Sequence, residues 1–357
     1  MHIRHMLGII DHPQACMELT VSHDQYPRVR FAKTPTPLEL MPNLSRLLGG
    51  ADLYVKRDDL TGLALGGNKV RQLEYYFGDI MEKGADTVIT TGATQSNHAR
   101  VTAAMASKLG LKCEVQHENR VPDRDDTYYE SGNVLLLKLM GVRLHDFPVG
   151  EDEHGADAAL EDIADRVRSE GGKPYVIPLA PTQPPLGALG YVDMIGELLD
   201  QAREQELRID AIVTPSGSAA THGGILVGLR SRGSDIPVYG ICIRRPADAQ
   251  QDRVLDRSRA AARLIQRQDL IREDDVNVDD GYLGPGYGLP DDKLMEALQL
   301  AAAQEALIVD PVYSGKALAG LIGLVRQGVF RKDQNVVFVH TGGTPALFAY
   351  TGIFKDL

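Results

Sequence analysis

The chain has 357 residues and a formal net charge of −11, with 43% hydrophobic and 24% charged residues. This composition is typical of an ordinary globular protein, and the length allows two domains with sizeable cores. The excess of acidic residues argues against nucleic acid or an anionic membrane surface as a partner, because both bind basic patches.

The cysteine pattern indicates the compartment. Cys16, Cys113 and Cys242 lie far apart and form no CxxC pair. An odd number of cysteines without a framework is typical of a reducing compartment and argues against a zinc site. The N-terminal apolar run is too short for a signal peptide, and no later stretch could span a membrane. We therefore expect a cytoplasmic protein without a metal site.

In the first half of the chain, β-branched segments alternate with segments whose apolar residues recur at helical spacing. Residues 1–50 are expected to form a proline-punctuated lead-in that ends in a short helix. The expected strands are Ala51–Arg57, Thr87–Thr91, Lys112–Gln116, Val142–His145 and Pro174–Pro178. The expected helices are Val70–Met81, Ala99–Leu109, Gly132–Met140 and Gly155–Glu170.

The second half continues the pattern. The expected strands are Ala211–Thr214, Val238–Ile243, Leu307–Val309 and Asn335–His340, and the expected helices are Gly187–Glu204, Thr221–Arg230, Asp291–Gln304 and Ser314–Gln327. Such alternation predicts an α/β fold with mostly parallel sheets covered by helices on both faces. Because no linker marks a boundary, we expect two interleaved three-layer α/β/α domains: a large one from residues 1–66 and 187–357, and a small one from residues 67–186.

Ligands of such sheets bind beyond the carboxyl ends of the strands, so the loops that follow strands are the places to search. Lys69 follows two glycines and precedes a helix. Asn68 is a good N-cap, so Lys69 is expected in the first turn, where the helix dipole disfavours a cation. Such a lysine is easily kept neutral and nucleophilic, as a Schiff-base lysine must be. A solvated surface lysine is the alternative that this stretch alone leaves open.

The segment Pro215–Thr221 has the sequence expected of an anion site. A strand ends, small residues expose their backbone N–H groups and a helix begins, which is the arrangement that holds a phosphate. The Walker lysine and the GxGxxG spacing are missing, so neither a nucleoside triphosphate nor a dinucleotide is indicated. A single phosphate on a small cofactor fits better, and a simple tight turn is the alternative.

Three further loops carry polar side chains. Residues 92–98 place Gln95, Ser96 and Asn97 between a strand and a helix, where amides and a hydroxyl could hold a carboxylate or a phenolic oxygen. Ser96 could also transfer a proton, whereas a structural role is expected for His98. A third cradle is expected in residues 341–344. A candidate amine nucleophile, a cradle for one phosphate and polar loops together suggest pyridoxal phosphate as the cofactor.

Tyrosines occur in two loops rich in glycine and proline: Tyr287 and Tyr313. A loop tyrosine usually packs against its neighbours. Beside a substrate sulfur or carbon, however, its hydroxyl could act as an acid.

Six motifs in order make the chain recognisable: LGGNKVRQLEYY, TGATQSNHARVTAA, PSGSAATHGGI, GPGYGLP, DPVYSGKALAGLI and HTGGTPALFAY. Together they resemble the D-cysteine desulfhydrase and 1-aminocyclopropane-1-carboxylate (ACC) deaminase family. Those enzymes use pyridoxal 5'-phosphate and have the tryptophan-synthase-β fold, called fold type II. The resemblance runs from about Pro35 to Tyr350. It implies that the large domain binds the cofactor and that the protein is a homodimer.

The resemblance also implies roles for individual residues. Lys69 matches the lysine that forms the Schiff base, and Asn97 matches the asparagine beside the cofactor's phenolic oxygen. Thr341 matches the hydroxyl residue that faces the pyridine nitrogen. The phosphate loop is matched by Ser216, Gly217, Ser218, Ala219, Ala220 and Thr221. The residues near the substrate are matched by Gln95, Ser96, Asn97, Tyr287 and Tyr313, of which Ser96 and both tyrosines are, with Lys69, the catalytic candidates.

Two departures from the family pattern bear on the substrate. ACC deaminases have a glutamate directly after the DPVY tyrosine, where this chain has Ser314, so the strong electron sink needed to open a cyclopropane is not expected. Residues 179–187 replace a Gly-Gly-Ser-Asn stretch of the desulfhydrases, and Thr94 replaces a common isoleucine. The loop around Thr94 is similar to that of L-cysteate sulfo-lyases, which belong to the same family.

We therefore expect α,β-elimination on a small β-substituted amino acid, with D-cysteine giving pyruvate, sulfide and ammonia. L-cysteate, with sulfite as the leaving group, is the alternative. The segment 179–187 contains no basic residue for a sulfonate, which favours the thiol. Retention of Lys69, Ser96 and both tyrosines argues against a non-catalytic binding module. The absence of GxGxxG argues against an NAD-dependent oxidoreductase.

Overall fold

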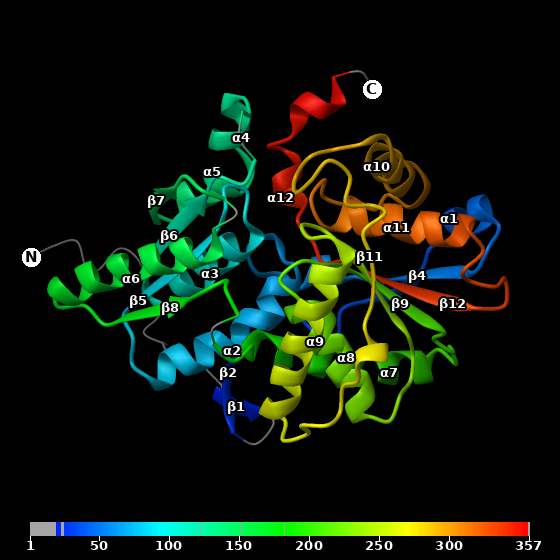
Figure 1. Ribbon diagram of the computed structural model, residues 1–357, viewed down its shortest axis with the longest axis horizontal. Coiled ribbons are helices and arrows are strands. Elements are labelled where there is room, and N and C mark those ends of the chain that lie inside the picture. Colours follow the sequence, from blue (N-terminus) through cyan, green and yellow to red (C-terminus); the bar gives the residue numbers. More distant parts are fainter. Residues whose placement is uncertain (1–18, 23–24, 122, 151, 182, 356–357) are drawn as a thin grey trace, which may run out of the picture.

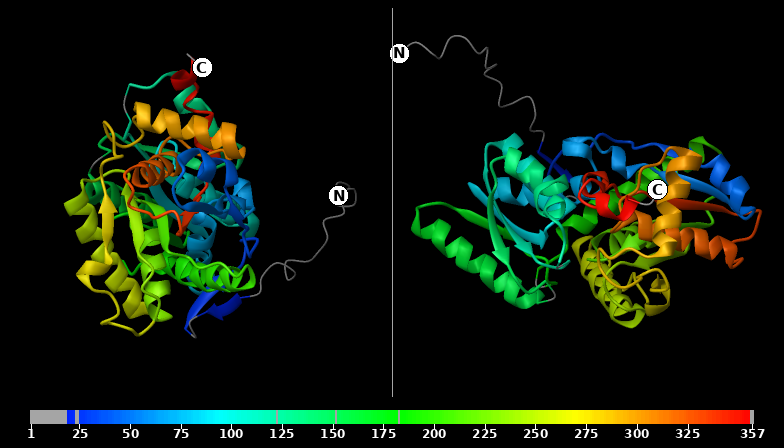
Figure 2. Two further views of the ribbon diagram at one scale, coloured as in Figure 1. Left: turned by 90° about the vertical axis from the view of Figure 1, so that its right-hand side faces the viewer. Right: turned by 90° about the horizontal axis from the view of Figure 1, so that it is seen from above.

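The computed structural model describes residues 19–22, 25–121, 123–150, 152–181 and 183–355, so Cys16 lies outside the described residues. Two mostly parallel sheets stand side by side, each covered by helices (Figures 1 and 2). The four strands of the smaller sheet all come from residues 87–177, and the six strands of the larger sheet come from both flanks of that segment. The α/β class predicted from the sequence is confirmed, whereas the domain boundaries at residues 66 and 186 stay a prediction.

The larger sheet has the strand order β11-β10-β9-β12-β4-β3, and only the β3–β4 pair is antiparallel. The smaller sheet, β7-β6-β5-β8, is parallel throughout. A separate antiparallel pair joins β1 to β2. The strands are β1 Leu19–Ser22, β2 Tyr26–Val29, β3 Leu38–Leu40, β4 Asp52–Lys56, β5 Thr87–Ala93, β6 Lys112–Glu118, β7 Arg143–Phe147, β8 Pro174–Ile177, β9 Ala211–Ser216, β10 Val238–Cys242, β11 Asn277–Asp279 and β12 Asn335–Val339.

Helices cover both faces of each sheet. The longer helices are α2 Asn68–Glu82, α3 Asn97–Leu109, α6 Glu153–Ser169, α7 Leu189–Glu204, α8 Ala220–Ser231, α9 Ala247–Leu264, α10 Asp292–Glu305 and α11 Ser314–Arg326, and the shorter ones are α1 Pro42–Leu48, α4 Asp126–Glu130, α5 Gly132–Leu139 and α12 Thr344–Leu347. Within the parts of the chain that the structure describes, no helix has the length and apolar character needed to cross a lipid bilayer.

Successive residues of the central strands face opposite layers, as the period of two in a β-strand requires. In β5, Val88 packs among residues of α2 and α3, whereas Ile89 packs against α6. In β12, Phe338 packs in the cluster of α1, α10 and α11, and Val337 packs in the cluster of α7, α8 and α9. Because both faces are buried, every residue of β5 is buried, and in β12 the apolar run Val336–Val339 is unbroken.

One expected element was wrong, and one long helix was missed. Leu307–Val309 forms no strand in the described structure, because Ala306 has a positive φ of 49° and the Leu307 N–H closes the end of α10 on the Ala301 carbonyl. The helix α9 was missed altogether. Its sequence is dominated by Asp, Arg, Gln and Ala, so its narrow apolar stripe gave little periodic signal.

A buried ionic network attaches α2 to the larger sheet. The Arg71 guanidinium donates to Asp58 at 3.0 Å and to Glu197 of α7 at 2.9 Å. Lys56 of β4 also contacts Glu197, at 2.5 Å, and the Tyr191 hydroxyl donates to Asp58 at 2.7 Å. Burial opposes ionisation of Asp58, but Arg71 holds the pKa of its carboxyl below the ordinary value. The network therefore depends on every member staying charged and paired.

We expect Asp58→Asn to lower the free energy of unfolding by about 3–5 kcal/mol, since it removes the fully buried one of the two carboxylates that pair with the buried Arg71 charge. Urea unfolding measures the change. Glu39→Gln, which breaks the more exposed pair with Arg57, is the control and should change stability by less than about 1 kcal/mol. Equal effects of the two substitutions would contradict the role assigned to the network.

Candidate active site

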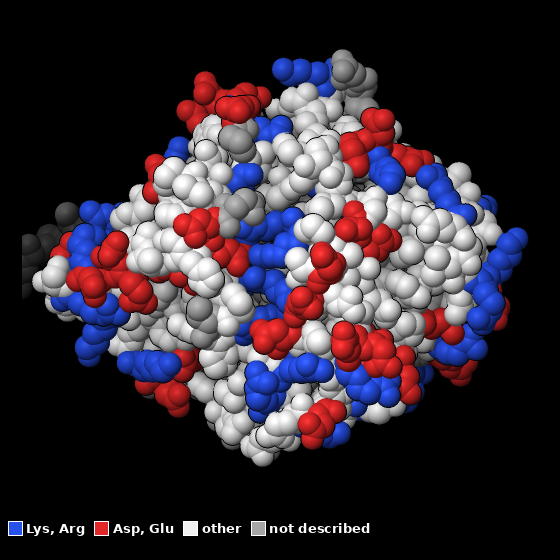
Figure 3. Space-filling view, viewed as in Figure 1, with Lys and Arg blue, Asp and Glu red and all other residues white. Residues whose placement is uncertain are grey.

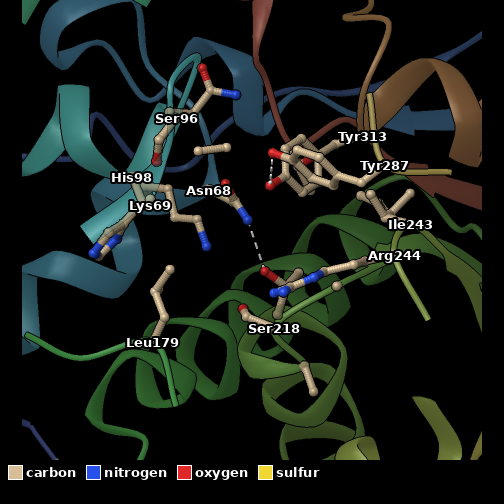
Figure 4. Close-up of a pocket in the computed structure, with 18 of the residues that line it drawn as sticks. Asn68, Lys69, Ser96, His98, Leu179, Ser218, Ile243, Arg244, Tyr287 and Tyr313 are labelled. Atoms are coloured by element: carbon tan, nitrogen blue, oxygen red, sulfur yellow. Dashed lines mark hydrogen bonds between the residues drawn. The ribbon is translucent and has the colours of Figure 1, made fainter. Parts of the chain in front are cut away.

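A pocket lies between the two sheets, at the carboxyl ends of β5, β9, β10 and β12 (Figure 4). This is where ligands bind in open parallel sheets. Its lining includes most of the residues singled out in the sequence: Lys69, Ser96, Asn97, Gly217, Ser218, Ala219, Thr221, Tyr287, Tyr313 and Thr341.

Lys69 lies in the first turn of α2, and its amine points into the pocket (Figure 4). Asn68 was expected to be the N-cap, but Gly67 holds that position and Asn68 is the first helical residue. The surroundings of the Lys69 amine are poorly solvating, and burial lowers its pKa to about 8. A substantial fraction of the amine is therefore neutral near pH 8, as a nucleophile requires.

Gln72 orients the lysine and was missed in the sequence. Its side-chain oxygen accepts a hydrogen bond from Lys69 Nζ at 2.9 Å, and its nitrogen donates to Thr221 Oγ1 at 2.8 Å. Asn68 Nδ2 donates to the same hydroxyl at 2.9 Å. These bonds join the start of α2 to the start of α8. Gln72 lies three residues after Lys69 and therefore on the same face of the helix, and this spacing could have predicted a contact between the two side chains.

The loop between β9 and α8 forms a cradle of backbone donors. Ala219 adopts the left-handed conformation with φ 71°, and α8 begins at the next residue. The first N–H groups of a helix have no partner within it, and they carry the positive end of its dipole. Ser216 differs from the expectation: its hydroxyl is buried against His222 and Gln250, outside the pocket lining. Ala220 also lies outside that lining.

At the end of β5, Ser96 and Asn97 face the pocket. Ser96 is the N-cap of α3, where its oxygen accepts the Ala99 N–H at 3.1 Å and its own proton stays available to a ligand. A Cβ at Gly92 would lie 2.4 Å from Ser96 Oγ, so only glycine fits there. Asn133 Nδ2 donates to Asn97 Oδ1 at 3.0 Å, which leaves the Asn97 amide nitrogen as the group offered to a ligand.

Gln95 does not line the pocket. Its side-chain nitrogen donates to the carbonyls of Tyr128 and Ser131, and its oxygen accepts the Asn133 N–H at 2.8 Å. The Gln95 amide is thus committed to the turn between α4 and α5, and through Asn133 it supports Asn97. A direct substrate contact, as expected from the sequence, does not fit this geometry.

The two tyrosines form a pair across the pocket from Lys69, next to Ile243 (Figure 4). The hydroxyls of Tyr287 and Tyr313 are 2.8 Å apart, and the Arg120 guanidinium lies over the Tyr287 ring at 5.7 Å from its centroid. Burial raises the pKa of Tyr287 and of Tyr313 above the ordinary value. Both hydroxyls therefore stay protonated at neutral pH and can donate a hydrogen bond or a proton.

His98 lies beside Lys69 (Figure 4). Burial and, to a smaller extent, the Lys69 charge lower the pKa of His98 to about 3, so the ring is neutral. Its Nε2 lies 2.9 Å from Thr90 Oγ1, which itself donates to the Ile177 carbonyl. Nε2 therefore carries the proton. Thr341 follows β12, and its carbonyl accepts the Asn68 N–H at 3.0 Å.

Arginines in the pocket were also missed. Arg120, Arg244, Arg245 and Arg253 all line it, although none lies in the segment 179–187 in which a basic residue was sought. Lys and Arg side chains gather along the central hollow of this face (Figure 3). Among the described residues that line the pocket, Glu153 is the one carboxylate.

A family model described as pyridoxal-phosphate-dependent enzyme matches residues 29–342. The chain is 43% identical to D-cysteine desulfhydrases of Salmonella typhimurium and Salmonella choleraesuis over 326 residues, which is 91% of this chain and 97% of each relative.

Solved structures agree with this match. The crystal structure of an ACC deaminase homologue aligns with a TM-score of 0.83 at 37% identity, covering 92% of this chain and 95% of the other. A pyridoxal 5'-phosphate-dependent aspartate racemase aligns with a TM-score of 0.61 at 17% identity over 86% of this chain and 90% of the other, which shows the fold alone.

The residues present fit pyridoxal phosphate. A lysine of low pKa can bind its aldehyde, the start of α8 can bind its phosphate through backbone N–H groups, and the Asn97 amide can donate to its phenolic oxygen. The close approach of Gly342 to Gly67, where a Cβ at Gly342 would lie 2.7 Å from the Gly67 Cα, keeps the strand end and the lysine together.

The lowered pKa of Lys69 predicts an unusual pH profile for labelling of the cofactor-free protein. Because the neutral amine is the reactive form, modification of Lys69 by an amine-reactive reagent should be half-maximal near pH 8. Peptide mass spectrometry measures it, with an N-acetyl-lysine amide as the reference, whose amine has a pKa of about 10.4. Parallel profiles for the two amines would show that burial does not lower the pKa of Lys69.

Proposed function

The chain belongs to the family of pyridoxal-phosphate-dependent enzymes, and we propose that it is a carbon–sulfur lyase that converts D-cysteine to pyruvate, sulfide and ammonia. The observation that carries this proposal is the pairing of a desolvated lysine with a phosphate cradle in one pocket, in a chain 43% identical to D-cysteine desulfhydrases over nearly its whole length. When bound, pyridoxal phosphate supplies the electron sink that makes the α-proton of the substrate acidic.

The residues of the pocket would bind the cofactor, transfer the α-proton and orient the substrate. We propose that Lys69 binds the cofactor and, once free as a neutral amine, accepts the α-proton. Asn97 and Thr341 would hold the cofactor ring, and the N–H groups at the start of α8 would bind its phosphate. Ser96, with a free hydroxyl proton at the N-terminus of α3, orients the substrate carboxylate, which the positive end of the helix dipole also attracts.

The tyrosine pair is suited to deliver a proton. Tyr287 and Tyr313 share one hydrogen bond, so one hydroxyl donates to the other, and the proton of the second hydroxyl is free to bond to a ligand. Their raised pKa values keep both protonated while a thiolate leaves. We propose that the pair protonates the departing sulfur. The cationic Arg120 beside Tyr287 stabilises the negative charge that develops on the tyrosine oxygen during this transfer.

The arginines in the pocket favour the alternative substrate, L-cysteate, because a sulfonate binds cationic hydrogen-bond donors. Three of them, however, already share the Glu153 carboxylate. We therefore retain D-cysteine as the proposed substrate. ACC remains the weakest candidate: Ser314 lies in the glutamate position of ACC deaminases, and its hydroxyl donates to the buried Asp310 at 2.6 Å, outside the pocket lining.

We also propose a homodimer, on the basis of the family resemblance. Exposed apolar side chains near α5 and α12 support it, since Leu65 is 61% and Phe348 is 59% exposed and both border one groove. A large exposed apolar patch is a common mark of an interface. The cytoplasmic location inferred from the cysteines stays a prediction.

The products from separate candidate substrates test the function. The purified, cofactor-loaded protein should release pyruvate and sulfide from D-cysteine. Lys69→Ala should abolish the activity, because Lys69 is the one lysine among the described residues that line the pocket. If L-cysteate alone gave pyruvate and sulfite, the leaving group would be sulfite and the proposal of D-cysteine as substrate would be wrong. 2-Oxobutyrate from ACC would contradict the argument from Ser314.

The tyrosine pair gives a second prediction. Tyr287→Phe should lower kcat by about 10²–10⁴-fold, the usual contribution of a general acid, with a much smaller change in KM. Tyr282→Phe, which removes a hydroxyl from the same loop that is bonded to Gln327, is the matched control and should retain activity. Steady-state kinetics measure both, and an unchanged kcat for Tyr287→Phe would exclude the proton-donor role.

A further inference from the structure

The pocket contains an arginine cluster that the elimination of a thiol does not use. Arg244 and Arg245 follow β10, and Arg253 lies in α9; we call these three residues the arginine trio. All three line the pocket and are largely buried, with side-chain exposures of 7%, 19% and 12%. Guanidinium groups turned toward one cavity are typical of recognition of a carboxylate, sulfonate or phosphate.

One carboxylate occupies this cluster. Glu153 Oε1 lies 2.6 Å from Arg244 and 2.5 Å from Arg245, and Oε2 lies 2.9 Å from Arg253. Glu153 is the first residue of α6, which covers the smaller sheet, so its side chain reaches across the pocket to the flank of the larger sheet. Helix α6 thus supplies an internal anion to the trio.

The balance of charge in the cluster is positive. Burial opposes ionisation of Glu153, but the trio outweighs it and lowers the pKa of the carboxyl. Burial and repulsion by Arg253 lower the pKa of Arg245 to about 10, despite its contact with Glu153. If the Glu153 carboxylate were removed, the three guanidinium groups would attract an anion from solution in its place.

We propose that Glu153 is a specificity-determining residue that fills a receptor for an acidic group, formed by the arginine trio. It thereby restricts the enzyme to substrates whose β-substituent carries no strong acid. A second acidic group entering the pocket has to approach the Glu153 carboxylate, and such like-charge contact is an effective way to reject a wrong ligand. The inference rests on the proposed function for the position of the substrate and goes beyond it in naming what excludes acidic amino acids.

Sulfate is the probe of the receptor. Cofactor-loaded wild type, Glu153→Gln and Glu161→Gln are titrated with sulfate, and the thermal unfolding midpoint is followed at each concentration. Glu161 lies on the same helix but at the surface, 3.5 Å from Arg168, so it controls for the change of charge and for the general stabilisation by sulfate. We expect sulfate to bind Glu153→Gln at least about tenfold more tightly than either of the other proteins.

Kinetics provide the second readout. In Glu153→Gln, the ratio of kcat/KM for cysteate, tested as both enantiomers, to that for D-cysteine should rise at least about tenfold. The double variant Glu153→Gln/Arg253→Gln should lose the gain, because the receptor itself is damaged. In the wild type, cysteate should inhibit turnover of D-cysteine no better than serine does, a comparison that needs no variant to fold.

The outcomes separate the two proposals. No gain in sulfate affinity in Glu153→Gln, a gain that persists in the double variant, or a change in pyridoxal phosphate affinity alone would overturn the role of Glu153. The last result would mean that the trio serves the cofactor phosphate, since Arg245 also contacts the Gly217 carbonyl. Failure of the wild type to act on D-cysteine would overturn the proposed function, while the sulfate comparison would still decide the role of Glu153.

Discussion

In the proposed mechanism, the chemistry depends on a lysine amine that lies where water solvates it poorly. Lys69 is located by α2, and two residues later Arg71 anchors that helix to Asp58 and Glu197 in the interior. The anchoring charges are paired with one another, whereas the lysine amine donates to the neutral Gln72 amide and has a pKa lowered to about 8. One helix turn therefore combines a rigid ionic attachment with a nucleophile that can be neutral.

The two sheets contribute different parts of the site. The smaller sheet supplies Ser96 and Asn97 at the start of α3, and the larger sheet supplies the start of α8 and the tyrosine pair. Thr221 joins them, because its hydroxyl accepts hydrogen bonds from both Asn68 and Gln72. Glu153 and the arginine trio make a second connection across the pocket. The same contacts thus connect the two sheets and, in our proposal, determine which substrates are accepted.

The fold and the loops at strand ends could be predicted from sequence because both signals are local. Apolar periodicity gave the strands, and short polar runs after them placed Lys69, Ser96 and Asn97 correctly in the pocket. The features that sequence analysis missed depend on contacts between residues far apart in the chain. Glu153 and the arginines meet across 91 to 100 positions of chain, which no spacing rule reveals. For Gln95, the sequence indicated the correct loop but not the orientation of the side chain. Only the packed turn between α4 and α5 shows that the Gln95 amide points toward that turn.

The most direct test of the account is to find which lysine carries the cofactor. Reduction of the loaded enzyme with borohydride makes the lysine–cofactor bond permanent, and peptide mass spectrometry then locates it. Lys316 is the built-in competitor: its pKa is also lowered to about 8, but its amine donates to the carbonyls of Leu283 and Gly286. We predict that the modified peptide contains Lys69. Modification of Lys316, or of any other lysine, with Lys69 unmodified would contradict the central claim.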